Sequence, residues 1–290
     1  MLGAIIGDCA GSTYEVKEVL EKLKKSKVSA EERRMVLNRS IPLFPKSSSV
    51  TDDSILTIAV ADAYLNGKSY AECLREYGLR EVQKGLDLYG RSRFGKGFVN
   101  WLYNQELNGS YGNGCAMRIS SLPVLIDDVE ELKKEVYEAT IPTHNNREAI
   151  LCAEALSVAI FMAKNNSSKE EIKSYIEDNY FSLDFDLKDL QENYEFTSRA
   201  ISSVPQAIYV FLESNDFEDS IRKAISIGGD ADTIACMVGS ISEQFYGIPK
   251  EIKEEIKKYI PDYFNDILNK FNERINENGC KILGGKTKRK

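Results

Sequence analysis

Residues 228–247 read GGDADTIACMVGSISEQFYG, and this stretch carries the clearest structural signal in the chain. A glycine pair and an acidic turn precede a run of small and apolar residues, which predicts that a helix begins near Asp230. Small residues recur at every fourth position, at Ala231, Ala235 and Gly239. One face of this helix would therefore admit another helix at close range.

A second glycine-punctuated helix is predicted at the start of the chain, where residues 3–15 read GAIIGDCAGSTYE. Gly3, Gly7 and Gly11 fall on one face of this helix. Repeated glycine destabilises an isolated helix, so close packing against another element is the physical reason to place it there. Asp8 could cap or pair with a neighbouring helix, and Glu15, at the edge of a charged stretch, could be a surface or a catalytic residue.

The rest of the chain also follows helical periodicity. Apolar faces recur in two further segments, at Ile55, Leu56, Ala59, Val60, Ala63 and Tyr64, and at Ile150, Ala153, Leu156, Ile160 and Ala163. Glycine and proline fall between such segments, and there is no internal repeat or linker-like shift in composition. With 290 residues, 42% of them hydrophobic, the chain is predicted to fold as one all-α domain, a compact bundle of many helices.

Charge and cysteine usage narrow the classes of partner. A net charge of −7 opposes binding to nucleic-acid phosphate and to anionic membranes. The six cysteines form no CxxC pair and have no histidine cluster beside them, which argues against a zinc site and a disulfide framework. No signal peptide or membrane-spanning run is recognisable. We therefore expect a cytoplasmic monomer.

Two acidic clusters each precede a small-residue-rich apolar segment: Thr51-Asp52-Asp53-Ser54, and Asp230 to Thr233. For each cluster alone, helix capping and metal binding are equally good explanations. Together, four carboxylates that meet in space need cations to neutralise them. All the available ligands are hard oxygens, which favours Mg²⁺, Mn²⁺ or Ca²⁺ over Zn²⁺.

Two weaker signals lie between these clusters. Residues 109–114 read GSYGNG, a loop rich in backbone donors that could cradle phosphates, although a simple turn is the better explanation of the loop alone. His144 is the chain's one histidine, and a lone histidine is more often structural than catalytic. Met117 and Arg118, which follow the GSYGNG loop closely, could likewise be structural or functional residues.

Taken together, these segments resemble the ADP-ribosylhydrolase (ADP-ribosylglycohydrolase) family, whose members include the dinitrogenase reductase-activating glycohydrolase. The family pattern is carried, in the family's order, by GAIIGDCAGSTYE, TDDS, SYGNGCAMR, the TH at 143–144 and GGDADTIACMVGSISEQFYG. The resemblance runs from residue 3 to about residue 247. Position 54 is Ser where Thr is more usual, a change that keeps the hydroxyl.

The resemblance implies an all-α fold with a dinuclear Mg²⁺ centre, in which Mn²⁺ could replace Mg²⁺. The residues in the ligand positions are Thr51, Asp52, Asp53, Asp230, Asp232 and Thr233. We expect residues 1–280 to form the catalytic domain, with 16–41 as a mobile flap, and residues 281–290 to form a basic tail.

The resemblance also implies an ADP-ribose site. The residues in the matching positions are Gly95, Gly97, Gly109, Ser110, Tyr111, Gly112, Asn113, Gly114 and His144, with Tyr111 on the adenosine side. Glu15 is the candidate general acid, and Asp52, Asp53 or Asp230 are the alternatives. The predicted activity is Mg²⁺-dependent hydrolysis of the bond between ADP-ribose and a protein side chain, serine or arginine, or another acceptor. A non-catalytic ADP-ribose-binding module is the alternative.

Overall fold

The structure is a computed structural model, and it describes residues 1–23, 27–85, 92–104 and 109–285 of the 290-residue chain. Within these ranges the chain forms helices joined by loops, and extended segments pair only at two isolated bridges, Gly109 with His144 and Gly112 with Arg199. The predicted all-α, single-domain class is confirmed.

The α-helices are, in chain order, α1 (Leu2–Leu23), α2 (Ala30–Arg34), α3 (Asp52–Asn66), α4 (Tyr70–Gln83), α5 (Lys96–Asn104), α6 (Leu122–Leu125), α7 (Val129–Thr140), α8 (Arg147–Lys164), α9 (Lys169–Asn179), α10 (Leu187–Asn193), α11 (Val204–Leu212), α12 (Phe217–Ser226), α13 (Ala231–Tyr246), α14 (Lys250–Ile256) and α15 (Asn265–Gly285). Short 3₁₀ helices are η1 (Met35–Leu37), η2 (Asn113–Cys115), η3 (Ala200–Ser202) and η4 (Asp262–Phe264).

The centre of the bundle is the contact between α1 and α13. A Cβ atom placed on Gly3 would lie 2.2 Å from the carbonyl oxygen of Gly239, and one placed on Gly11 would lie 2.5 Å from the Cα of Asp232. Such distances leave no room for any side chain, so the two backbones touch along the whole glycine face. The close approach predicted from the small residues of both segments is confirmed.

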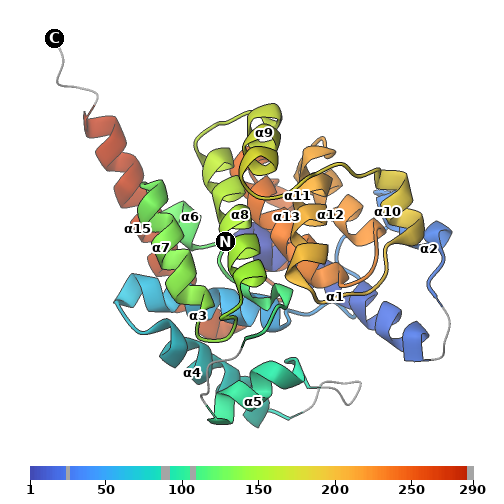
Figure 1. The fold of residues 1–290 in the computed structure, drawn as a ribbon, viewed down its shortest axis with the longest axis horizontal. Helices are drawn as coiled ribbons and strands as arrows, with labels where there is room; N and C mark the ends of the chain where they lie inside the picture. Colours follow the sequence, from blue (N-terminus) through green and yellow to red (C-terminus); the bar gives the residue numbers. More distant parts are fainter. Residues whose placement is uncertain (24–26, 86–91, 105–108, 286–290) are drawn as a thin grey trace.

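The other helices surround this pair. In Figure 1, α8, α11 and α12 lie beside α13, and each of them packs against it. The helices α3, α4 and α5 form the lower part of the molecule in the same view, where α3 contacts both α4 and α1. The N-terminal ends of α3 and α13 are therefore both held next to α1.

The starts of α3 and α13 are set by local chemistry. Thr51 caps α3, and its side-chain oxygen accepts a hydrogen bond from the backbone N–H of Asp53 (3.4 Å). Gly228 and Gly229 precede α13 with φ of 75° and 69°, a backbone conformation that disfavours any residue with a Cβ. Asp230 occupies the cap position of α13 but makes no side-chain capping bond, so its carboxylate is available for other contacts.

The region predicted as a flap, residues 16–41, is built from the end of α1, α2 and η1, and residues 24–26 lie outside the described part. Arg33 donates to the carbonyl oxygens of Tyr194 (3.0 Å) and Ile227 (3.1 Å). Arg222 of α12 donates to those of Val36 (2.7 Å) and Ile41 (2.9 Å). The second half of the region is thus fastened to the bundle.

At the other end of the chain, α15 continues to Gly285, past the predicted domain end at 280, and residues 286–290 of the basic tail lie outside the described residues. Figure 1 shows the last turns of α15 extending away from the bundle.

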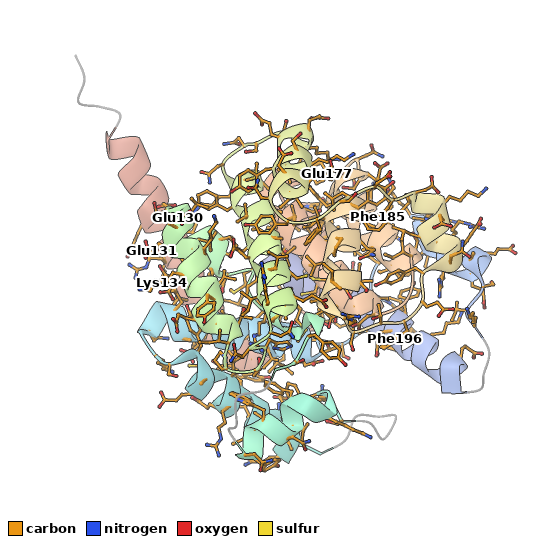
Figure 2. All side chains as sticks on the ribbon, in the orientation of Figure 1. Glu130, Glu131, Lys134, Glu177, Phe185 and Phe196 are labelled. Atoms are coloured by element: carbon orange, nitrogen blue, oxygen red, sulfur yellow. The ribbon has the colours of Figure 1, made fainter. Side chains whose placement is uncertain are left out.

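Charged side chains lie on the surface of the bundle, as on α7. Figure 2 shows Glu130, Glu131 and Lys134 on the outer side of α7, where all three are exposed.

None of the helices in the described ranges is both long enough and apolar enough to cross a membrane. Cys9, Cys73, Cys115, Cys152 and Cys236 are free and buried, and the side chain of Cys280 lies outside the description.

Candidate active site and metal centre

A buried carboxylate, that of Asp8 in α1, forms hydrogen bonds with the start of α3. This carboxylate accepts hydrogen bonds from the backbone N–H and hydroxyl of Thr51 (2.9 and 2.7 Å) and from the backbone N–H (3.1 Å) and hydroxyl of Ser54. Burial raises the pKa of Asp8, and the hydrogen bonds from Ser54 and Thr51 oppose that rise. Asp8 therefore fixes the N-terminus of α3 relative to α1.

Asp53 and Thr233 connect α3 to α13. The hydroxyl of Thr233 donates to Oδ2 of Asp53 (3.2 Å), and the hydroxyl of Thr51 lies 3.4 Å from the same oxygen. The other oxygen of Asp53, Oδ1, is buried and has no hydrogen-bond partner within the described residues. A buried carboxylate oxygen without a partner is costly, and a cation would remove that cost.

Carboxylates from all three helices converge at Asp53. Asp8, Asp53 and Asp232 each offer an oxygen, and these oxygens all lie within 4.8 Å of one another. Burial, followed by the negative charge of Asp8, raises the pKa of both Asp52 and Asp53 well above the usual carboxyl range. Burial, followed by the charge of Glu15, does the same for Asp232. The residues present fit a hard divalent cation, which would offset this concentration of like charge.

These side chains line a cavity of about 740 Å³, a volume typical of small-molecule sites. Its lining includes Glu15, which stands near Asp52 and Asp232, since its charge raises the pKa of both. The predicted ligand residues all line the same cavity: Thr51, Asp52, Asp53, Asp230, Asp232 and Thr233. The two segments of sequence that carry these ligand residues, at the starts of α3 and α13, are thus brought to one place beside Glu15 of α1.

The GSYGNG loop forms another part of the cavity wall. Ser110, Gly112, Asn113 and Gly114 line it, together with His144 and with Gly95 and Gly97 of the loop before and at the start of α5. Phe196, from the segment after α10, contributes an aromatic ring to the same wall, and Figure 2 marks its position.

Two residues of the predicted ADP-ribose site lie outside this lining. Gly109 pairs with His144 in an isolated bridge. Tyr111 is 57% exposed, and the guanidinium of Arg199 lies over its ring at 5.4 Å from the centroid. Tyr111 and Arg199 therefore form a platform on the surface beside the loop.

Several backbone donors of the loop are already used within the protein. The N–H of Gly112 donates to the hydroxyl of Ser110 (3.2 Å), and that of Asn113 donates to the carbonyl oxygen of Ser198 (2.7 Å). The side chain of Asn113 donates to Oδ2 of Asp230 (2.7 Å). Asn113 thus links the loop to the acidic cluster, and the loop offers fewer free donors than its sequence suggests.

Asp8 is the main residue of the site that sequence reasoning did not place there. The signal was present: Asp8, Ser12 and Glu15 follow one another at i, i+4 and i+7, the spacing of one helix face. Ser12 and Glu15 line the cavity, and Asp8 is buried next to the lining acids Asp53 and Asp232. The glycines on the adjacent face indicate helix packing, and on that interpretation Asp8 is a capping or pairing residue.

A helical bundle with a buried carboxylate cluster beside a ligand-sized cavity is typical of a small-molecule site, whose acids can transfer protons or hold a hard cation. The sequence profile of the ADP-ribosylglycohydrolase family matches residues 1–280, and the chain belongs to this family of glycosyl hydrolases.

Individual relatives agree with that assignment. ADP-ribosylhydrolase ARH3 of Gallus gallus is 26% identical, over 85% of this chain and 84% of the relative, and ADP-ribosylhydrolase ARH3 of Homo sapiens is 24% identical over 86% and 84%. ADP-ribosylarginine hydrolase Tri1 of Pseudomonas putida (strain GB-1) is 24% identical over 86% of this chain and 70% of the relative. A solved structure described as an ADP-ribosylglycohydrolase-related protein complex shares the fold, with a TM-score of 0.61, 20% identity and coverage of 95% and 92%.

Proposed function

We propose that this protein is a Mg²⁺-dependent ADP-ribosylhydrolase that cleaves the glycosidic bond between ADP-ribose and a modified protein side chain, serine or arginine. One observation carries the proposal. A single cavity is lined by Glu15, by the acids of both clusters, and by loop residues Ser110, Gly112, Asn113 and Gly114 with His144. A cavity with acids at one part of its wall and polar loop groups at another suits a ligand that is a sugar at one end and a diphosphate in the middle.

The acids at the base support the metal requirement. Asp53, with one unpartnered buried oxygen, and Asp232, whose carboxylate lies against it, are the strongest ligand candidates, and Asp52, Asp230, Thr51 and Thr233 complete the set. When bound, Mg²⁺ would orient the ribose hydroxyls and make a water molecule a better nucleophile. Asp8 accepts four hydrogen bonds, so we assign it to holding Thr51 and Ser54 in place.

Glu15 supports the hydrolytic step. Breaking the bond at the anomeric carbon passes through an oxocarbenium-like state, and the departing side chain needs a proton. Glu15 is a half-buried residue within α1 that lines the cavity near the acids, where its carboxyl can deliver a proton to the leaving atom or hold a water molecule. We propose Glu15 as the general acid, with Asp52, Asp53 and Asp230 as alternatives.

The other part of the cavity supports recognition of ADP-ribose. The hydroxyl of Ser110, the amide of Asn113 and the imidazole of His144 all lie on one wall, with Gly95 and Gly97 also in the lining. The exposed ring of Tyr111, backed by Arg199, lies on the surface next to this wall and offers a flat face for an adenine.

The decisive experiment is a panel of proteins carrying serine-linked, arginine-linked or otherwise linked ADP-ribose. Release of ADP-ribose would be measured with Mg²⁺, with EDTA, and with the Asp232→Ala variant as a matched control for the metal site. We expect release of ADP-ribose from at least one linkage with Mg²⁺, and none with EDTA or the variant.

Two other outcomes would decide against parts of the proposal. Saturable binding of ADP-ribose without release from any linkage would make the protein an ADP-ribose-binding module. Full release of ADP-ribose after exhaustive chelation would mean that the protein is a hydrolase whose acids act without a metal ion.

A further inference from the structure

Three buried polar side chains at the cavity wall are joined to one another by hydrogen bonds. Arg118, which is 0% exposed, donates from Nη2 to the carbonyl oxygen of Ala139 (2.9 Å) and to the hydroxyl oxygen of Thr143 (2.8 Å). That hydroxyl lies 2.7 Å from Nδ1 of His144. Arg118, Thr143 and His144 all contribute to the cavity lining.

The direction of these hydrogen bonds follows from the chemistry of Arg118. A guanidinium has donors and no acceptor, so the oxygen of Thr143 accepts from it. The hydroxyl hydrogen of Thr143 then needs an acceptor of its own, and Nδ1 of His144 is the acceptor within reach in the described residues. If Nδ1 carried the proton, the buried hydroxyl hydrogen would have no partner, at a cost of about 1–3 kcal/mol.

The charge state of the ring follows from the same surroundings. Burial, and then the positive charge of Arg118, lower the pKa of His144 to about 3. Burial also lowers the pKa of Arg118, to about 10, which still leaves the guanidinium charged near neutral pH. His144 is therefore a neutral imidazole beside a guanidinium that is charged near neutral pH, and a second positive charge on the ring would be repelled.

The remaining ring nitrogen faces the loop that lines the cavity. A Cβ atom placed on Gly112 would lie 3.5 Å from Nε2 of His144, and one placed on Gly114 would lie 3.6 Å from it. The two glycines therefore lie next to this nitrogen and place no side chain over it.

We propose that Arg118 and Thr143 are positioning residues that hold His144 as a neutral imidazole protonated on Nε2, so that the cavity presents a fixed N–H donor to an anionic oxygen of the ligand. This inference rests on the proposed function only for the identity of that oxygen, which in ADP-ribose belongs to the diphosphate. Because the donor is neutral, it would keep the same strength across the pH range in which an ordinary histidine gains a charge.

The chain has one histidine, so NMR of the ¹⁵N-labelled protein reports on this ring alone. Long-range ¹H–¹⁵N correlation spectra of the full chain, recorded without ligand between about pH 6 and pH 8, should show a protonated Nε2 and an unprotonated Nδ1 throughout. The Thr143→Val variant removes the hydroxyl and should convert the ring to a mixture of tautomers. Thr143→Ser should restore the wild-type pattern.

A matched control is available one turn away. Thr140 is also fully buried, and its hydroxyl has no hydrogen-bond partner in the described part of the chain. Thr140→Val should leave the histidine spectrum unchanged. In calorimetry with ADP-ribose, Thr143→Val should lose roughly tenfold in affinity, the effect of one misdirected hydrogen bond, while Thr143→Ser and Thr140→Val should stay within about twofold of wild type.

A wild-type ring protonated on Nδ1, or doubly protonated near neutral pH, would overturn the proposal, and so would a Thr143→Val spectrum identical to that of wild type. If Thr143→Val does not fold, the wild-type spectrum still decides between the tautomers. The NMR measurements need no ligand, so their result stands even if the protein proves not to be a hydrolase, and a wrong tautomer would leave the hydrolase proposal intact.

Discussion

Gly7 of α1 and Ala235 of α13 meet backbone to backbone: a Cβ atom on Gly7 would lie 1.9 Å from the carbonyl oxygen of Ala235. Gly7 lies one residue before Asp8, and Ala235 lies two residues after Thr233, so this contact sets the distance between the two helices that carry the site. The geometry of the acidic cluster therefore depends on a residue that has no side chain.

We expect Gly7→Ala to destabilise the protein strongly. The new methyl group would strike backbone atoms that cannot rotate away, so the loss should reach or exceed the ~1–3 kcal/mol typical of overpacked cores. Denaturant unfolding followed by circular dichroism would measure it. Gly78→Ala on α4 is the matched control, because its nearest neighbour is the side chain of Leu102, 2.7 Å away, which can move. Equal stability losses for the two variants would contradict the rigid contact.

Asp8→Asn should lower both stability and Mg²⁺ binding. Asp8 receives four hydrogen bonds from Thr51 and Ser54, and an amide NH₂ in its place would point donors at donors. Asp232→Asn is the comparison, since there the change removes a like charge from the cluster. Without metal, Asp8→Asn should have a lower Tm than wild type and Asp232→Asn an equal or higher one. The reverse order would show that Asp8 acts as a ligand more than as a support.

Addition of Mg²⁺ should raise Tm, and chelation should abolish turnover. The pKa values of Asp52, Asp53 and Asp232 are raised by burial and by neighbouring charge, so the folded chain holds protons more tightly than the unfolded chain. Such groups favour the folded state at low pH, and this contribution is lost as pH rises. The Mg²⁺-dependent rise in Tm should therefore be larger at about pH 8 than at about pH 5.5. Rescue by Zn²⁺ but not by Mg²⁺ or Mn²⁺ would count against oxygen ligation.

The loop offers a pair of variants that separate ligand binding from metal binding. A side chain at Gly112 would approach Ser110 Oγ, at 3.2 Å from a Cβ, and His144 Nε2, so Gly112→Val should weaken ADP-ribose binding and leave the Mg²⁺ effect on Tm intact. Asn113→Ala should weaken both, because Asn113 donates to Asp230. Calorimetry with ADP-ribose and thermal melts with Mg²⁺ test the pair. Unchanged affinity for ADP-ribose in both variants would mean that the loop is a simple turn with no part in binding.

Close packing on the small-residue faces of α1 and α13 could be predicted because its cause is local, although neither face identifies its partner. Glycines every fourth residue in one segment and small residues every fourth residue in another leave close helix packing as the reason for both patterns. The two aspartate clusters were equally visible, since each opens a helix. That these helix ends meet depends on long-range packing, which periodicity does not encode, and the resemblance to a family supplied that step.

The parts that sequence reasoning missed depend on contacts between distant residues. Asp8 was considered as a capping or pairing residue, and only the fold shows that Thr51 and Ser54 are its partners. The amide of Asn113 was assigned to a loop, yet it reaches Asp230. Tyr111 lies outside the cavity lining because its loop is tied to Ser198 and Ala200, which no local pattern indicates.

The last prediction concerns Glu15. This residue directly precedes the region 16–41 expected to be a mobile flap, and the structure carries it on the continuous helix α1, where it lines the cavity near Asp52 and Asp232. A residue held by a helix needs little rearrangement to act on a bound substrate, so its contribution should lie in the chemical step. Glu15→Gln keeps the size of the side chain and removes the proton that the carboxyl can transfer. We expect this variant to bind ADP-ribose within a few-fold of wild type and to lose roughly 10²-fold or more in kcat on the best substrate of the panel.

Single-turnover release of ADP-ribose at saturating enzyme would separate this loss from any change in product release, and calorimetry would measure the affinity. The matched control is Glu32→Gln: Glu32 lies outside the cavity lining and pairs at the surface with Lys17. This variant should turn over at the wild-type rate. If Glu15→Gln does so as well, Glu15 is a wall residue, and the proton must come from Asp52, Asp53 or Asp230. If Glu15→Gln instead loses affinity in proportion to its rate, Glu15 binds the substrate in the ground state and is not the general acid, because a proton donor in the transition state changes kcat and leaves binding in place.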